Sequence, residues 1–201
     1  MSKLYFRYGV VGSSKTTCLL TVHHNYQRQG KNVLLIKPKM DTRSGDMVYS
    51  RTGLQTKADI LLDNGDDLIA LVEERKNIDC ILVDEAQFIK SDHILQLRYI
   101  TIAYNIPCIC FGLRTTYQGV LFEGAYTLLA LADSIEEIKN TCWMCGKKAI
   151  MNLKCIDGKA TMEGDDSPDL GFEEKYLPVC FKHYFTALNP SVILPESQSE
   201  Q

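Results

Sequence analysis

The feature that most restricts the fold of this chain is a turn rich in glycine and serine, which joins a short strand to a helix near the N-terminus. Residues 4–10 predict the strand and residues 15–28 predict the helix. The sequence GVVGSSKT at 9–16 fits the phosphate-binding pattern GxxxxGK[ST], except that Ser14 replaces the glycine before Lys15. Because the pattern is meaningful only between a strand and a helix, this context predicts an α/β fold.

The chemistry of such a loop follows from its backbone. Its N–H groups point at phosphate oxygens, and the positive end of the helix dipole adds to the attraction. Lys15 is expected to neutralise the β and γ phosphates of ATP, and Thr16 to offer its hydroxyl to Mg²⁺. Serine at position 14 costs little if the backbone there is helical, but its Cβ can crowd the nucleotide where the loop closely approaches a phosphate. The loop residues assigned to ATP and Mg²⁺ are Gly9, Gly12, Ser13, Ser14, Lys15 and Thr16.

Short apolar runs alternate with helix-like segments through the first 140 residues. This rhythm predicts βαβ units around a mostly parallel sheet, as in P-loop NTPases. Continuous apolar strands suit a sheet that is covered on both faces. After the first strand and helix, the predicted strands are 32–36, 78–83 and 106–111, and the predicted helices are 67–76 and 94–104.

Two adjacent acids follow the strand at 78–83, in the sequence VDEAQF. They are expected at the carboxyl edge of the sheet, where open α/β sheets bind ligands. Neighbouring side chains of a strand point in opposite directions, so the two acids take different roles. Asp84, with Gln87 nearby, is assigned to ATP and Mg²⁺, and Glu85 is the candidate general base for an acceptor hydroxyl.

Two pairs of metal ligands lie in the C-terminal third of the chain. Cys142 and Cys145 form one pair, Cys180 and His183 form the other, and 34 residues separate them. Four such ligands suit tetrahedral Zn²⁺, and a site closed by four protein ligands is structural. The change to a sequence rich in Cys, Gly and Lys after Lys139 marks a second domain. We therefore expect an ATP-binding domain at 1–140, a zinc-binding domain at 141–190 and a flexible tail at 191–201.

Composition excludes several classes of protein. The 201 residues include 22 Lys and Arg against 25 Asp and Glu, which gives a net charge of -3 without a basic block for nucleic acid. No apolar run reaches the roughly 18–20 residues that a membrane span requires, and the N-terminus lacks the apolar core of a secretory signal. We expect a cytoplasmic protein with no nucleic-acid or membrane partner.

Taken singly, each motif also has a simpler explanation: a strand–turn–helix without a ligand, solvated acids at a strand end, or free surface cysteines. Taken together and in order, the motifs resemble the type II thymidine kinases, a family with a P-loop domain and a zinc-bearing lasso domain. The similarity spans residues 4–185 and rests on LYFRYG (4–9), KPKMDTRSG (37–45), SRTG (50–53), VDEAQF (83–88), FGLRT (111–115), LFEGAYTLLALAD (121–133), CWMC (142–145) and YLPVCFKH (176–183).

The resemblance implies an ATP-dependent kinase that converts thymidine to its 5′-monophosphate, with deoxyuridine as an alternative substrate. Glu85 takes the place of the family's proton acceptor, and residues 167–176 correspond to the lasso loop over the base. The family also implies a homotetramer. The substrate-binding residues carried over are Tyr117, Phe122, Asp169, Leu170, Gly171 and Tyr176.

Departures from the family pattern keep two other functions open. Ser14 alters the ATP loop, and Phe172 in the lasso puts a bulky side chain where glycine allows close backbone approach. The first alternative is a catalytically impaired protein of this type that binds nucleosides or nucleotides. The second is a P-loop ATPase without a nucleoside substrate.

Overall fold

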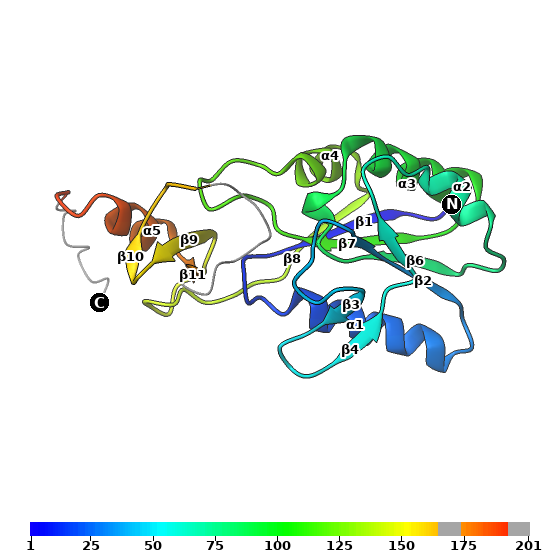
Figure 1. Cartoon of the computed structure of the whole chain (residues 1–201), viewed down its shortest axis with the longest axis horizontal. Coiled ribbons are helices and arrows are strands. Elements are labelled where there is room, and N and C mark those ends of the chain that lie inside the picture. Colours follow the sequence, from blue (N-terminus) through cyan, green and yellow to red (C-terminus); the bar gives the residue numbers. More distant parts are fainter. Residues whose placement is uncertain (165–173, 193–201) are drawn as a thin grey trace.

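The computed structural model describes residues 1–164 and 174–192, which form a large lobe and a small lobe (Figure 1). The large lobe is built on a six-stranded sheet in which every neighbouring pair is parallel. This confirms the predicted fold class. The strands, in spatial order, are β5 (Ile60–Leu62), β2 (Val33–Pro38), β6 (Cys80–Val83), β7 (Cys108–Gly112), β1 (Leu4–Tyr8) and β8 (Ser134–Glu137).

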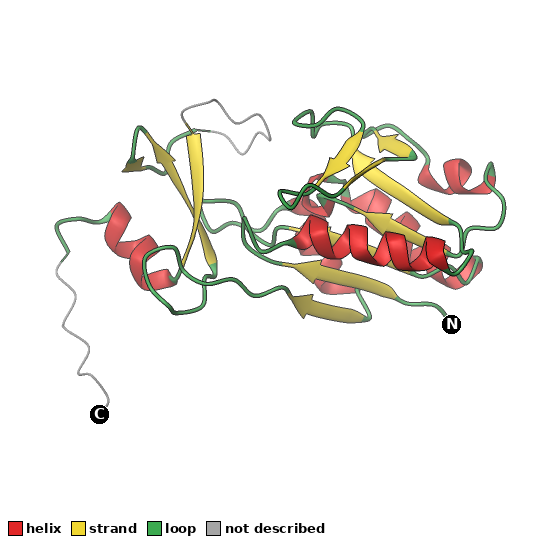
Figure 2. Ribbon diagram, turned by 90° about the horizontal axis from the view of Figure 1, so that it is seen from below, coloured by secondary structure: helices red, strands yellow, loops and turns green. Residues whose placement is uncertain are grey.

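Helices cover both faces of this sheet (Figures 1 and 2). Helix α1 (Lys15–Arg28) lies on one face, and α2 (Leu68–Glu73), α3 (Ser91–Ala103) and α4 (Glu123–Leu131) lie on the other. Successive strand residues alternate between two apolar cores: Leu34 and Ile36 pack under α2, α3 and α4, whereas Leu35 packs under α1. Burial on both sides explains the uninterrupted apolar strands of the sequence.

The predicted elements of the large lobe are present, with shifted ends. Helix α1 has its predicted limits. Helix α2 starts one residue later than predicted, because Asp67 is its N-cap and accepts hydrogen bonds from the Ile69 and Ala70 N–H groups, and it ends at Glu73, three residues before the predicted end. Several elements of the large lobe were not predicted from the sequence: β5, α4, β8, the hairpin of β3 (Met47–Tyr49) and β4 (Gln55–Lys57), and the short 3₁₀ helix η1 (Ala86–Phe88) after β6.

The small lobe contains a three-stranded antiparallel sheet and one helix. Its elements are β9 (Met151–Ile156), β10 (Lys159–Ala160), β11 (Glu174–Val179) and α5 (Phe181–Leu188). It has its own core, in which Met151, Leu153 and Val179 pack around Cys142 and Cys180. The expected boundary at residue 140 falls between the end of β8 and the Thr141–Lys148 bridge that begins this lobe.

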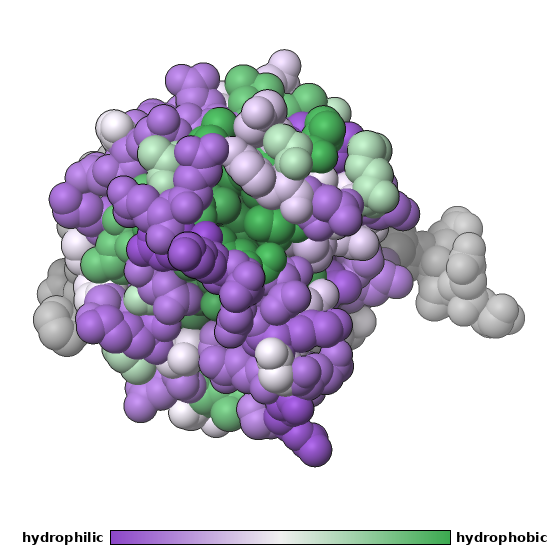
Figure 3. All heavy atoms as spheres, turned by 90° about the vertical axis from the view of Figure 1, so that its right-hand side faces the viewer, coloured by the Kyte–Doolittle hydropathy of each residue, from purple (hydrophilic) through white to green (hydrophobic). Residues whose placement is uncertain are grey.

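The described residues include no helix that is long and apolar enough to cross a membrane. Hydrophilic side chains surround a central apolar area at the end of the large lobe that lies far from the small lobe (Figure 3).

Candidate active site and metal centre

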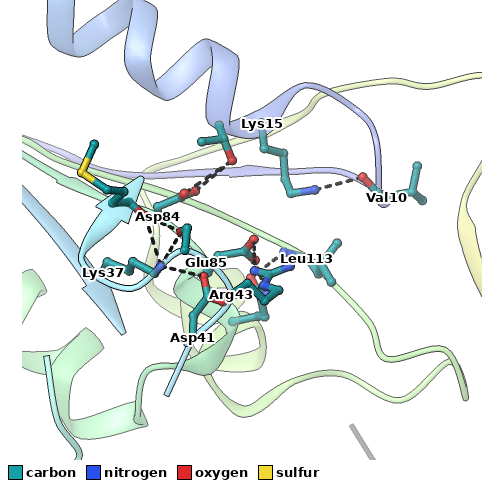
Figure 4. A network of polar contacts seen from close by, with 12 residues as sticks. Val10, Lys15, Lys37, Asp41, Arg43, Asp84, Glu85 and Leu113 are labelled. Atoms are coloured by element: carbon teal, nitrogen blue, oxygen red, sulfur yellow. Dashed lines mark hydrogen bonds and ion pairs between the residues drawn. The ribbon is translucent and has the colours of Figure 1, made fainter. Parts of the chain in front are cut away.

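A cleft of about 460 Å³ opens at the carboxyl edge of the parallel sheet. The loops after β1, β2, β6 and β7 all contribute to its lining, as expected for ligand sites in open α/β sheets. Lys15, Lys37, Asp84, Glu85 and Arg43 come together there (Figure 4). Residues as far apart in the sequence as Val11 and Leu113 thus meet in one cleft.

The phosphate-binding loop is tightly wound between β1 and α1. Gly12 has φ +76°, and Ser14 directly before the helix has φ +66° and ψ +26°. The backbone at Ser14 is therefore left-handed, not helical, which is a glycine conformation that costs another residue roughly 1–2 kcal/mol. Ser14 therefore holds, with some strain, a backbone conformation that glycine adopts without strain.

Lys15 folds back over this loop. Its Nζ donates a hydrogen bond to the Val10 carbonyl oxygen at 2.9 Å (Figure 4). Burial lowers the pKa of Lys15, and the nearby carboxylates of Glu85 and Asp84 oppose this shift. The present partner of Lys15 Nζ is a neutral carbonyl oxygen, which an incoming phosphate can replace. The desolvated lysine is therefore available to bind an anionic ligand.

Thr16 and Asp84 face each other across the start of α1. The Thr16 hydroxyl lies 3.5 and 3.4 Å from the two carboxylate oxygens, both long for a direct hydrogen bond. Burial, followed by repulsion from Glu85, raises the pKa of Asp84 to about 7. One carboxylate and one hydroxyl suit Mg²⁺, which usually takes one or two carboxylates and completes its shell with water and phosphate oxygens. These residues fit the ion.

Asp84→Asn is expected to raise the melting temperature of the ligand-free protein, and to raise it more at pH 8 than at pH 5. The folded-state pKa of about 7 lies above the ordinary 3.8, so the acid contributes stability at low pH and loses it as the pH rises through 7. Asparagine resembles the protonated form and avoids the loss. Thermal unfolding without nucleotide or Mg²⁺ measures the effect.

The control for that experiment is Asp46→Asn. Asp46 is ion-paired with Lys57 at 3.0 Å, and its hydrogen bond to that lysine lowers its pKa. Its replacement should not stabilise the protein at pH 8. A gain at Asp84 that is equal at both pH values would contradict the titration argument.

Glu85 lies between two donors at the mouth of the cleft. Arg43 Nη2 donates to its Oε1 at 2.6 Å, and Gln87 Nε2 donates to its Oε2 at 2.6 Å. Gln87 is in turn fixed by the Leu113 N–H, which donates to its Oε1 at 2.9 Å. The backbone of Glu85 is left-handed, with φ +48°. Strain at such a position is typical of functional residues.

Arg43 belongs to a chain of charges that the sequence analysis did not assign to the site. Its Nε donates to Asp41 at 2.6 Å, and Asp41 lies 3.4 Å from Lys37 Nζ, which is 1% exposed. Burial alone would raise the pKa of Asp41, but Arg43 and Lys37 outweigh it and lower that pKa. Arg43 lies in KPKMDTRSG, which was among the matching motifs, but the sequence of this motif does not show that Arg43 contacts Glu85.

Arg51 is a further cation of the cleft that was not assigned to the site, although SRTG at 50–53 was among the matching motifs. Its loop is fixed to α1 by the Thr17 and Ser50 hydroxyls, which lie 2.5 Å apart. The Arg51 guanidinium reaches within 3.8 Å of the point that a Cβ on Gly12 would occupy. The phosphate loop therefore faces Arg51 as well as Lys15.

The four predicted zinc ligands gather in the small lobe. Their ligand atoms all lie within 4.8 Å of one another. The His183 Nδ1 lies 3.4 Å from the Cys142 sulfur and 3.3 Å from the Cys180 sulfur, and the Cys145 and Cys180 sulfurs are 4.0 Å apart. In a tetrahedral zinc site, ligand atoms at about 2.3 Å for sulfur and 2.0–2.1 Å for nitrogen lie roughly 3.5–3.8 Å apart. The cluster fits Zn²⁺.

Comparison with known proteins decides the family. The family model described as thymidine kinase matches residues 2–184. Thymidine kinases from Lactococcus lactis and Lactiplantibacillus plantarum are each 42% identical to this chain, over 92% of it and over 98% and 96% of their own lengths. A thymidine kinase from Lactobacillus acidophilus is 42% identical over 96% of this chain and its own full length. The chain belongs to the thymidine kinase family.

In this thymidine kinase family member, one expected substrate residue, Tyr117, lies where the large lobe meets the small lobe, next to Gly164 and Tyr176. Tyr117 is 3% exposed, its hydroxyl donates to the Gly164 carbonyl at 2.5 Å, and its ring lies 6.0 Å from that of Tyr176. Phe122 packs edge-on against Phe88, which lines the cleft. Neither Tyr117 nor Phe122 lines the cleft itself. The other expected residues, Asp169, Leu170 and Gly171, lie outside the described residues.

Proposed function

We propose that this protein transfers the γ-phosphoryl group of ATP to the 5′-hydroxyl of thymidine, giving ADP and thymidine monophosphate. The observation that supports this most is the placement of the Glu85 carboxylate in the same cleft as Lys15, Thr16 and Asp84. A base for the acceptor and a cradle for the donor phosphates are the two parts that phosphoryl transfer requires.

In the proposed reaction, Glu85 as a carboxylate accepts the proton of the 5′-hydroxyl while the oxygen attacks the γ phosphorus. The new O–P bond forms as the bond to the β-phosphate oxygen breaks, and ADP leaves. Lys15 turns from the Val10 carbonyl to the phosphates, and the N–H groups at the start of α1 bind their oxygens. Mg²⁺, held by Thr16 and Asp84, supplies positive charge to the phosphates when bound.

Arg43 acts on Glu85 as a positioning group in this proposal. Its 2.6 Å bond to Oε1 and the 2.6 Å bond from Gln87 to Oε2 fix the carboxylate in the strained turn. Asp41 fixes Arg43 in turn. The base is therefore oriented before substrate arrives, which lowers the cost of reaching a reactive geometry.

The test of this function is an assay that couples ADP formation to a spectrophotometric signal, with Mg·ATP and thymidine both present. We expect ADP release that depends on thymidine and saturates with it. Thymidine-independent hydrolysis would identify an ATPase instead, and absence of turnover would overturn the proposal. Deoxyuridine in place of thymidine measures the breadth of the base pocket. The homotetramer and the cytoplasmic location expected from the sequence stay predictions.

The second candidate is an impaired kinase that still binds nucleoside, and the strained Ser14 favours it. We expect Ser14→Gly to increase kcat/KM for ATP by at most about thirtyfold, because the serine already holds the left-handed backbone and the strain that glycine can release is worth roughly 1–2 kcal/mol. An activation of a hundredfold or more would instead support the impaired kinase. Steady-state kinetics with ATP as the varied substrate distinguishes the two.

A further inference from the structure

Asn152 is a buried polar residue on a strand of the small lobe. It is 4% exposed and lies between Met151 and Leu153 on β9, both of which pack in the core around the zinc ligands. Side chains alternate along a strand, so Asn152 points away from that core. Its amide reaches the large lobe.

The amide of Asn152 connects two loops of the large lobe. Its Oδ1 accepts a hydrogen bond from the Val11 N–H at 2.8 Å, and its Nδ2 lies 3.5 Å from the Thr115 carbonyl oxygen. Val11 is in the phosphate-binding loop, and Thr115 is in the loop that follows β7. A buried amide makes such bonds because leaving its polar atoms unpaired is costly.

The next peptide of the phosphate loop is also held from this side. Asn140, in the connection to the small lobe, donates from its Nδ2 to the Val11 carbonyl oxygen at 3.3 Å. Lys15 already engages the Val10 carbonyl. Side chains thus fix two successive peptide groups at the start of the loop. Two of these side chains, Asn140 and Asn152, lie outside the sheet and helices of the large lobe.

A strand pairing and a backbone hydrogen bond connect the four-ligand cluster to Asn152. Asn152 pairs with Pro178 across β9 and β11, and the Pro178 carbonyl accepts a hydrogen bond from the Trp143 N–H, between the ligands Cys142 and Cys145. The metal cluster, β9 and the phosphate loop therefore form one continuous set of contacts.

We propose that Asn152 is a positioning residue through which the zinc-bearing lobe fixes the shape of the ATP-binding loop. The inference rests on the proposed function for its kinetic readout, but it concerns ATP binding alone. With Asn152 in place, the loop is ordered before ATP arrives, so binding does not have to order it. The 2.8 Å bond to Val11 is much shorter than the 3.5 Å contact to Thr115, which places the main effect on ATP and not on the nucleoside.

The test compares Asn152→Ala with a matched variant, Asn189→Ala. Asn189 is another asparagine of the small lobe, and its Nδ2 donates to the Phe185 carbonyl at 2.9 Å, away from the phosphate loop. We expect Asn152→Ala to raise KM for ATP about fivefold, the effect of one lost hydrogen bond, with kcat and KM for thymidine changed less than twofold. Asn189→Ala should leave all three unchanged. Asn140→Ala removes the hydrogen bond to the Val11 carbonyl oxygen and should also raise KM for ATP.

Two further measurements separate this role from simple destabilisation. Trp143 is the single tryptophan of the chain, so its emission during urea unfolding reports on the small lobe. Calorimetric titration of Mg·ATP without nucleoside gives Kd directly, and it stays informative even if the wild type fails to phosphorylate thymidine.

An unchanged ATP affinity in Asn152→Ala overturns the proposal. So does a rise in both KM values together with an early Trp143 transition, because that pattern indicates general loss of structure. A fivefold weaker Kd for ATP with a normal Trp143 transition supports it. If the wild type binds ATP but shows no thymidine-dependent turnover, the proposed function fails while this comparison still decides the role of Asn152.

Discussion

Glu85→Gln is expected to lower kcat with thymidine by roughly 10²–10⁴-fold, the usual contribution of a general base. Glutamine is close in size, and its single amide oxygen can still accept from one of the two donors, Arg43 or Gln87, that lie 2.6 Å from the Glu85 oxygens; its NH₂ group cannot accept from the other. What glutamine cannot do is take the proton of the 5′-hydroxyl. Because substrate contacts are preserved, KM for ATP should change little, and the loss should be confined to turnover.

The matched control is Glu136→Gln. Glu136 is also paired with an arginine, since Arg7 Nε lies 3.0 Å from its Oε2, but it is on β8 and does not line the cleft. This variant should turn over at the wild-type rate. If Glu85→Gln keeps more than a tenth of the wild-type kcat while its melting temperature is unchanged, another group serves as the base and the mechanism is wrong.

Loss of the metal is expected to unfold the small lobe and abolish turnover. The lobe has a small core made largely of Cys142, Cys180 and their neighbours, so little apolar burial remains once the ligands separate. Structural zinc contributes on the order of 10–16 kcal/mol in isolated zinc-finger peptides, more than such a core supplies. We expect about one zinc per wild-type chain and less than a tenth of that in Cys142→Ser, measured by elemental analysis.

Trp143, next to Cys142, makes the structural part of this prediction measurable. Because Trp143 is already 65% exposed, the intensity and anisotropy of its emission, and not its wavelength, should change in Cys142→Ser, or in the wild type after treatment with a strong chelator, and thymidine-dependent turnover should fall as well. Cys155→Ala is the control, because Cys155 is buried in the same core but stands outside the four-ligand cluster. A Cys142→Ser protein that lacks zinc yet retains the wild-type emission intensity, anisotropy and activity would contradict a structural role for the metal.

The parts of this structure that the sequence predicted are those set by local signals. Helix α1 begins at Lys15 and ends at Arg28 as expected, because the phosphate loop and Gly30 delimit it. The cluster of Cys142, Cys145, Cys180 and His183 was predictable for a similar reason, because two short ligand pairs can be recognised without knowing the fold around them. The parallel sheet followed from its doubly buried strands.

The contacts between separate loops were not predictable in the same way. The bond from Arg43 to Glu85 joins loops after two neighbouring strands, and its existence depends on how far each loop reaches over the sheet. The hydrogen bond between Val11 and Asn152 joins residues that are 141 positions apart in the sequence and belong to different lobes. The left-handed backbone at Ser14 also opposes the residue's own preference, and the sequence had left the backbone conformation at this position open.

The left-handed backbone at Glu85 has a consequence for anyone who evolves this protein in the laboratory. Among the described residues, five that are not glycine have positive φ; three are Asn77, Asn105 and Asp157, residue types that tolerate it, and the others are Ser14 and Glu85. A screen for heat resistance alone will favour glycine or asparagine at position 85, which relieves the strain and removes the carboxylate. Thermostable lineages of this protein should therefore be selected for turnover in every round, because at this position the two properties demand different amino acids.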